Sequence, residues 1–249
     1  MPMNPYAQLS DDYYLNLNLT TEMPLPKGRE PVLHYFEQVQ KKYPQMRNFS
    51  TRDKDSFLLE EDKDRGDYCW ASVEQRRLCS GQVNPETPEQ ALKQHRHILD
   101  IAPYALSLSP LDCEALDIFM GFDFSYRGNQ NQLLAETLGV SPAMEQLASI
   151  PGSKLIHHEP SLTVALDEDC RLQCRIGFES RTTEYQIRSG EYTDDQLSVY
   201  ITARHYGSLE AGVSYVEMLN RLWEVCQEVV DNYAAEAILQ PLSRAISLG

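Results

Sequence analysis

The stretch "YYLNLNLT", from Tyr13 to Thr20, alternates apolar and polar side chains with a period of two. Successive side chains of a β-strand point to opposite faces of its sheet, so this pattern buries one face and leaves the other in water. The two faces carry Tyr13, Leu15, Leu17 and Leu19 on one side, and Tyr14, Asn16, Asn18 and Thr20 on the other. The stretch predicts a strand of a sheet that is covered on one face only.

The same alternation recurs along the chain and predicts further strands. They lie at 118–124, 162–166, 172–178 and 197–203, and residues 48–82 form a meander of short strands with tight turns. Tyr185 and Ile187 are assigned to one more strand. Strands therefore dominate two long parts of the chain.

Apolar side chains at helical spacing predict helices between these strands. A first helix follows Pro31 and stops at Pro44, and a second opens on the capping box at Thr87 and runs to about Ile101, before Pro103. Two shorter helices start at about Asn129 and at Ser141-Pro142. A long helix starts at Ser208 and ends near Pro241.

Strands and helices do not alternate regularly, which argues against a doubly wound parallel sheet. We expect an α+β fold of mostly antiparallel sheet, with helices packed on one face and a long C-terminal helix. Two ferredoxin-like halves are an alternative within this class. The expected organisation is a flexible arm at 1–12 and one compact domain at 13–249, which could also divide into halves at 13–150 and 151–249.

The chain of 249 residues has a formal net charge of -15. Such an acidic chain repels phosphate backbones, so we expect no nucleic-acid partner and no membrane partner. The first residues lack the basic and apolar regions of a signal peptide, which favours a cytoplasmic location. The six cysteines are scattered, which is typical of reduced, buried thiols.

Few residues offer a catalytic or metal-binding pattern, and we expect no catalytic residue, no cofactor and no metal. Cys170 and Cys174 would lie about 13 Å apart on a strand, too far to share a metal ion. Cys79 follows Arg76 and Arg77, which could lower its thiol pKa, but no base lies nearby in the sequence. We expect Cys79 to be a core residue.

Arginines on two predicted strands give the sharpest binding hypothesis. The polar face of one strand carries Arg171, Gln173, Arg175 and Glu179, and that of the last carries Ser198, Tyr200, Thr202 and Arg204. If the two strands share a sheet, Arg175 and Arg204 could bind a small anion together with Arg127, and Tyr200 or Gln173 would orient it. The alternative is that these arginines pair with Glu179, Glu184 or Glu191.

The long helix has apolar residues spaced alternately three and four apart, as in a coiled-coil seam. They are Val216, Leu219, Trp223, Cys226, Val230, Tyr233 and Ala237. The seam could form a homodimer through the helix 208–240, or it could cover the sheet of its own chain.

Several stretches together resemble an uncharacterised bacterial protein family of the kind found in planctomycete genomes. They include "PKGREPVLHYFE", "RRLCSGQVNP", "GFDFSYRGNQNQLLAETLG" and "ALDEDCRLQCRIGFESRT". The resemblance implies a bacterial cytosolic protein that folds as one unit, and it carries over no functional residue.

Two functions are therefore expected from the sequence. The first is a soluble protein that acts without catalysis, through protein contacts or self-association. The alternative is a binding protein or enzyme for a small anionic ligand, with the ligand on the arginine-bearing sheet face.

Overall fold

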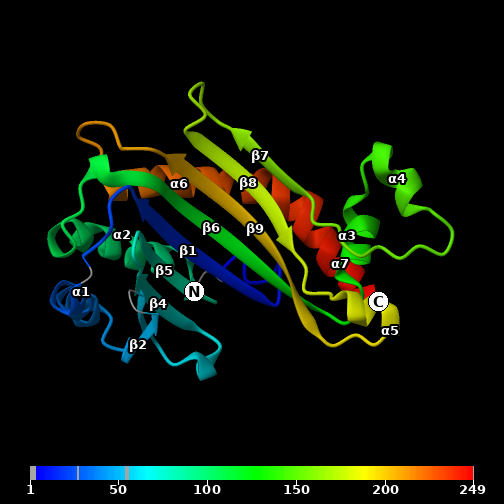
Figure 1. Ribbon diagram of the computed structural model, residues 1–249, viewed down its shortest axis with the longest axis horizontal. Coiled ribbons are helices and arrows are strands. Elements are labelled where there is room, and N and C mark those ends of the chain that lie inside the picture. The colour runs from blue at the N-terminus through cyan, green and yellow to red at the C-terminus, as the bar shows by residue number, and fades with distance from the viewer. Residues whose placement is uncertain (1–3, 27, 54–55, 249) are drawn as a thin grey trace.

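The computed structural model describes residues 4–26, 28–53 and 56–248, which form an α+β fold (Figure 1). These residues contain one antiparallel sheet of nine strands in the order β2-β3-β4-β5-β1-β6-β9-β8-β7. The strands are β1 (Asp12–Thr21), β2 (Asn48–Asp53), β3 (Ser56–Glu60), β4 (Tyr68–Val73), β5 (Arg77–Val83), β6 (Cys113–Tyr126), β7 (Ser161–Ala165), β8 (Leu172–Glu179) and β9 (Asp195–Tyr206). The predicted fold class is confirmed.

Helices occupy the connections between strands and the C-terminal end. They are α1 (Arg29–Lys42), α2 (Pro88–Ala105), α3 (Gln130–Leu138), α4 (Pro142–Ala148), α5 (Glu184–Ser189), α6 (Tyr215–Val229) and α7 (Gln240–Leu248). A π-helical segment (Val230–Leu239) joins α6 to α7, and short 3-10 turns lie at Lys63–Arg65 and Pro110–Asp112. Within the described ranges, no helix is both long enough and apolar enough to cross a membrane.

The sheet is covered by helices on one face. In Figure 1, α6 lies behind the strands, so the uncovered face, here called the open face, points toward the viewer. α6 packs on β6 and β9, and α2 packs on β1 and β5. The apolar set of β1 faces these helices and is almost completely buried, which confirms the one-sided burial that its alternation predicts.

β1 and β6 pair at the centre of the sheet, and the chain follows one plan on either side of them. After β1 comes α1, then a meander whose last strand, β5, returns to pair with β1 before α2 begins. After β6 come α3 and α4, then strands whose last member, β9, returns to pair with β6 before α6 begins. Each segment starts β-α-β, as a ferredoxin-like unit does, but ends on a helix after its meander.

The change from one segment to the next falls at 106–112, just before β6. The alternative division of the single domain at residue 150 would fall between α4 and β7. Both segments contribute to one continuous sheet and one buried core.

Local sequence explains one prediction that was wrong. Tyr185 and Ile187 belong to α5 and not to a strand. Thr183 and Gln186 form a reciprocal capping box at its start, and Gly190 ends it in a left-handed conformation. These capping contacts favour a helical turn over a strand although Tyr185 and Ile187 alternate.

The long C-terminal helix also differs in its bounds from the prediction. It begins at Tyr215 and not at Ser208, because Ser214 and Glu217 form its capping box. It continues through Pro241 to Leu248.

The apolar seam of this helix packs on its own sheet for its first half. Leu219, Cys226 and Val230 are fully buried, whereas Tyr233 is 63% exposed. A π-helix has more residues per turn than an α-helix, so the buried stripe changes phase after Val230 and passes to Ala234, Leu239 and Leu242. The regular heptad spacing therefore stops describing the buried face at the point where the π-helical segment begins.

Residues 4–11 lie against the body of the protein, although the sequence analysis assigned them to a flexible arm. Asn4 and Tyr6 are buried. The amide of Asn4 donates to the carbonyl of Pro85, and the hydroxyl of Tyr6 donates to Asp231 in the π-helical segment. This arm thus ties the C-terminal helix to the loop that precedes α2.

A small polar cluster is enclosed between α2 and the sheet. The side-chain amide of Gln94 donates to the Ser80 hydroxyl, which in turn donates to Nδ1 of His95 at 2.9 Å. Nε2 of His95 then donates to the carbonyl of Leu15 at 3.2 Å. His95 is fully buried, and burial lowers its pKa from the usual 6.5 to about 3, so the ring is neutral.

This depressed pKa predicts a specific loss of stability in acid. The unfolded chain binds a proton at His95 near pH 6.5 and the folded chain does not, so stability is complete above that pH and falls as pH drops toward about 3. We expect one proton to add a slope of about 1.4 kcal/mol per pH unit to the unfolding free energy. Urea unfolding at a series of pH values measures it.

His95→Gln should lower the stability at neutral pH but flatten this slope. His34→Gln, which changes an exposed histidine of α1, should leave the slope as it is. Equal slopes for the two variants would contradict a buried neutral His95.

Candidate functional site

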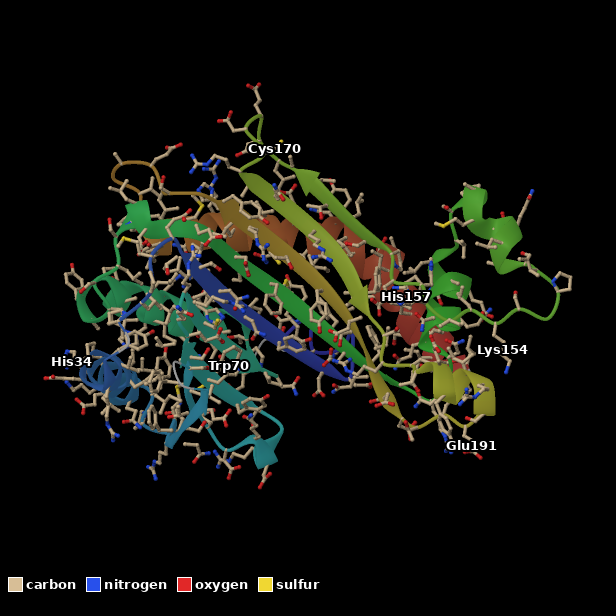
Figure 2. The ribbon with its side chains drawn as sticks, viewed as in Figure 1. His34, Trp70, Lys154, His157, Cys170 and Glu191 are labelled. Carbon is tan, nitrogen blue, oxygen red and sulfur yellow. The ribbon has the colours of Figure 1, made fainter. Side chains whose placement is uncertain are left out.

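The open face of the sheet carries polar and aromatic side chains and two hollows. The arginine hollow has a volume of about 470 Å³ and is lined by Asn18, Asp117, Phe119, Arg175, Gly177, Phe178, Glu179, Tyr200, Thr202 and Arg204. The tryptophan hollow has a volume of about 500 Å³ and is lined by Asp12, Tyr14, Asn16, Glu60, Lys63, Gly66, Tyr68, Trp70, Val83, Asp123 and Gln196. Figure 2 shows the side chains on this face and labels Trp70 of β4.

An ion pair forms one wall of the arginine hollow. The guanidinium of Arg204 on β9 contacts the carboxylate of Asp117 on β6, with its Nη2 2.8 Å and its Nε 3.0 Å from Oδ2. The amide of Asn18 on β1 donates to the other carboxylate oxygen at 3.0 Å. The three side chains come from adjacent strands, because Asp117 is paired in register with both Asn18 and Arg204.

The carboxylate of Asp117 is deeply buried, with 4% of its side chain exposed. Burial raises the pKa of Asp117, although Arg204 and Asn18 act to lower it. The charge of Arg204 is therefore largely committed to this carboxylate, and a further Nη1 bond joins Arg204 to the hydroxyl of Tyr206.

Arg175 on β8 stands in a different electrostatic environment. Its Nε donates to the hydroxyl of Ser161 at 3.1 Å, and its guanidinium lies over Gly177. Among the described residues, no carboxylate lies within ion-pair distance of this guanidinium. Arg175 therefore presents an uncompensated cation at the edge of the hollow.

An aromatic ridge separates the two hollows. Tyr14, Phe119 and Tyr200 come from β1, β6 and β9, and their ring centroids lie 6.0 to 6.4 Å apart in edge-to-face contacts. The hydroxyl of Tyr200 donates to Glu179, and that of Tyr14 donates to Asp123. Burial raises the pKa of Tyr200, which keeps its hydroxyl protonated as a donor.

Two glycines shape the ridge and the tryptophan hollow. A Cβ at Gly121 would overlap the ring of Tyr14, and a Cβ at Gly81 would overlap Trp70 and the amide oxygen of Asn16. These aromatic rings therefore lie down on the backbone of the neighbouring strands. Among the described side chains, Asn16 Oδ1 is buried without a hydrogen-bond partner, so the tryptophan hollow contains one unused acceptor.

The structure brings three of the five predicted site residues together. Arg175, Arg204 and Tyr200 all line the arginine hollow. Gln173 is paired with Arg204 in register, but its amide donates to the carbonyl of Cys170 in the adjacent turn. Arg127 lies beyond the opposite end of β6 from Asp117, about 30 Å along the strand, and its Nε donates to the carbonyl of Tyr192.

The acidic partner of Arg204 was not predicted from the sequence. The expected partners were Glu179, Glu184 and Glu191, whereas the observed partner is Asp117 on β6. Asp117 and Asn18 occupy polar positions of two alternating strands, so their face was readable from the sequence. The pairing of β6 with β9 is a contact between distant parts of the chain, and a local sequence pattern does not predict it.

Thiols and metal-binding side chains offer little chemistry in the described part of the chain. Cys79 is buried, and burial raises its pKa to about 11, which opposes a thiolate at neutral pH. Cys170 is exposed in a turn and Cys174 is buried on β8. In the same ranges, no group of three or more His, Cys, Asp and Glu side chains gathers as a metal ion would require.

Comparisons with known proteins give no family assignment. A scan against protein-family models finds no match, and a search of curated proteins finds no matching sequence. The resemblance to a planctomycete-type family stays a prediction.

The contact between Tyr14 and Gly121 predicts a steric effect at one glycine. In Gly121→Ala the new methyl group must displace the Tyr14 ring, so we expect a loss of about 1–3 kcal/mol. Gly177→Ala is the matched control on the same face, because its Cβ would make only ordinary contact, 3.5 Å from Arg175. Denaturant unfolding measures both.

The displaced ring itself provides the internal check. Adding Tyr14→Ala to Gly121→Ala should cost less than the sum of the two single changes, because the clash is then absent. Additive losses would show that the ring does not lie on Gly121.

Removing Arg204 leaves Asp117 as a buried charge without its cation. Breaking a fully buried pair costs roughly 3–5 kcal/mol, and we expect about 2 kcal/mol for Arg204→Ala because 39% of the Arg204 side chain is exposed. The variant further raises the already raised pKa of Asp117, so its deficit should shrink as pH falls and the carboxyl group is protonated. Unfolding free energies at about pH 8 and about pH 5 measure this.

The control is Arg204→Ala combined with Asp117→Asn, which should regain most of the lost stability at the higher pH. A deficit that is independent of pH and unaffected by Asp117→Asn would contradict the buried ion pair.

Proposed function

We propose that this protein binds a small ligand with one carboxylate or phosphate group in the arginine hollow, and that Arg175 makes the contact with the anion. The observation that carries the proposal is the guanidinium of Arg175. It faces the hollow without a carboxylate partner among the described residues, whereas Arg204 beside it is paired with Asp117. A planar guanidinium binds carboxylate and phosphate oxygens through two parallel hydrogen bonds.

The surroundings of Arg175 favour a ligand with an apolar body. Gly177 keeps the floor of the hollow low beneath the guanidinium, and Phe119 and Tyr200 supply aromatic surface beside it. Thr202, the cross-strand neighbour of Arg175, adds a hydroxyl to the lining. A flat or compact apolar group could pack on the rings while its anionic end meets Arg175.

The charge balance argues for a singly charged group rather than a polyanion. The lining contains two arginines and two carboxylates, from Asp117 and Glu179, so a second cation is not free. The whole chain is acidic and repels highly charged anions at long range. These features support a ligand with one anionic group.

The proposal assigns binding and no reaction. The Tyr200 hydroxyl already donates to Glu179, and burial raises its pKa, so the hydroxyl stays protonated and is not available to take up a proton. The ion pair of Arg204 and Asp117 forms a fixed wall of the hollow. In this proposal the pair orients the ligand and takes no part in a reaction.

A thermal-shift screen of monocarboxylates, aromatic carboxylates and phosphate monoesters tests the proposal. We expect at least one class to raise the melting temperature in a concentration-dependent way. Arg175→Ala should abolish the shift, and Arg175→Lys should weaken it, because an ammonium group cannot make the paired contacts.

Arg127→Ala is the matched control, since Arg127 is an exposed arginine that does not line the hollow. Its ligand-induced shift should equal that of the unaltered protein. A shift that survives Arg175→Ala, or that is lost equally in Arg127→Ala, would overturn the proposed site.

A further inference from the structure

β7 forms one edge of the sheet and has apolar side chains that its own chain leaves uncovered. It pairs with β8 on one side only. Leu162 is 66% exposed and Val164 is 43% exposed on the helix-bearing side of the sheet, and Leu166 follows them in the same row. In Figure 1, α6 lies behind β6 and β9, and β7 is the outermost strand at the edge of the sheet.

The free edge of β7 has a defined set of backbone groups. The N–H of Leu166 donates to the carbonyl of Leu172, so this residue forms a hydrogen-bonded pair with β8. Hydrogen-bonded pairs alternate along an antiparallel ladder, which places Leu162 and Val164 in the same bonded class as Leu166. The N–H and C=O groups of Ser161, Thr163 and Ala165 therefore point away from β8.

The two ends of β7 carry different polar side chains. The exposed His157 precedes the strand, and Asp167, Glu168 and Asp169 follow it. Figure 2 shows His157 near one end of β7 and Cys170, which adjoins the acidic turn, beyond the other. Glu159, the acid within the preceding segment, is occupied, since its carboxylate accepts from the amide and hydroxyl of Ser180.

We propose that β7 pairs antiparallel with β7 of a second copy of this chain, across a two-fold axis at Thr163. In this register Thr163 faces Thr163 of the second copy, and Ser161 faces Ala165, so the outward backbone groups bond to one another. An antiparallel pair places the His157 end of one strand beside the acidic turn of the other, where an imidazole N–H can donate to a carboxylate. The two-fold axis repeats this contact at both ends of the interface.

The same register covers the exposed apolar side chains. Leu162 lies opposite Val164 of the second copy in a close, non-hydrogen-bonded pair, on the helix-bearing side of both sheets. The two open faces then lie on the same side of one continuous sheet. Each arginine hollow comes near the new interface, because Arg175 is the cross-strand neighbour of Thr163.

A second copy fits this edge better than an unrelated strand. The exposed backbone, the apolar row and the polar ends of β7 are complementary to themselves under a two-fold rotation, as an isologous interface requires. The paired strands are only five residues long, so the interface is small and the dimer should be weak. It differs from pairing through the helix 208–240, whose seam is largely committed to its own sheet.

Sedimentation velocity from low to high micromolar protein tests the association, with Thr163→Pro as the decisive variant. Proline removes an outward N–H that β8 does not use, so the fold should persist while the self-pairing is lost. Circular dichroism and the melting temperature verify the fold. Leu162→Lys should also shift the protein to monomer. Tyr104→Lys is the control and should not, because Tyr104 is 91% exposed and belongs to α2 rather than to β7.

Disulfide trapping tests the register. Bonded antiparallel neighbours have Cα atoms about 5.5 Å apart, within the range of a disulfide. Thr163→Cys in a Cys170→Ser background, where the exposed native thiol is absent, should give a covalent dimer under mild oxidation. Tyr104→Cys in the same background is the control and should remain monomeric.

Each outcome bears on the proposal. Concentration-dependent dimers that Thr163→Pro and Leu162→Lys abolish, together with trapping at Thr163, support it. A strict monomer that is not trapped at Thr163 overturns it. A dimer that Thr163→Pro leaves intact also overturns it and points to another surface, such as the C-terminal helix.

Discussion

The antiparallel pairing of β1 with β6 at the centre of the sheet is the interaction on which the rest of the structure depends. Both strands place apolar side chains on the same side, so their union creates a surface that must be covered. α2 and α6 provide the cover, each directly after the strand that closes its own meander. Because α2 and α6 both pack on this side, the opposite face is left with the polar and aromatic side chains.

Much of this architecture was predictable from local patterns. Period-two alternation identified the strands, and capping residues such as Thr87 and Asn129 located helix starts. Two wrong predictions of secondary structure, at α5 and at the end of α2, also have local physical causes. The capping contacts around α5 outweighed the alternation of Tyr185 and Ile187. α2 continues past Pro103 to Ala105: the proline lies in the last turn, and beyond it Leu106 still donates to the carbonyl of Ala102.

The candidate site was predictable in part. The face of Arg175 and Arg204 followed from alternation, since each strand's polar side can be read from its sequence. What could not be read is which strands are neighbours, and the pairing of β6 with β9 decides that Asp117 neutralises Arg204. This single ion pair distinguishes the two arginines chemically. The shape of the open face was equally hidden, because the glycines at 81 and 121 acquire their meaning only from rings on adjacent strands.

The π-helical segment has a consequence for how the C-terminal helix can change during evolution. This segment, which has more residues per turn than an α-helix, connects two helices with different surroundings. α6 packs on the sheet, whereas α7 lies near α3. One residue advances an α-helix by about 100°. A single deletion within 230–239 that returned the segment to regular α-helix would remove one such step while restoring the tighter α-helical twist, so Leu239 and Leu242 would keep nearly the same facing toward the core. A deletion in α6, where no wide turn absorbs it, would instead rotate every helical residue that follows, so single-residue length changes should be tolerated within 230–239 before they are tolerated in α6.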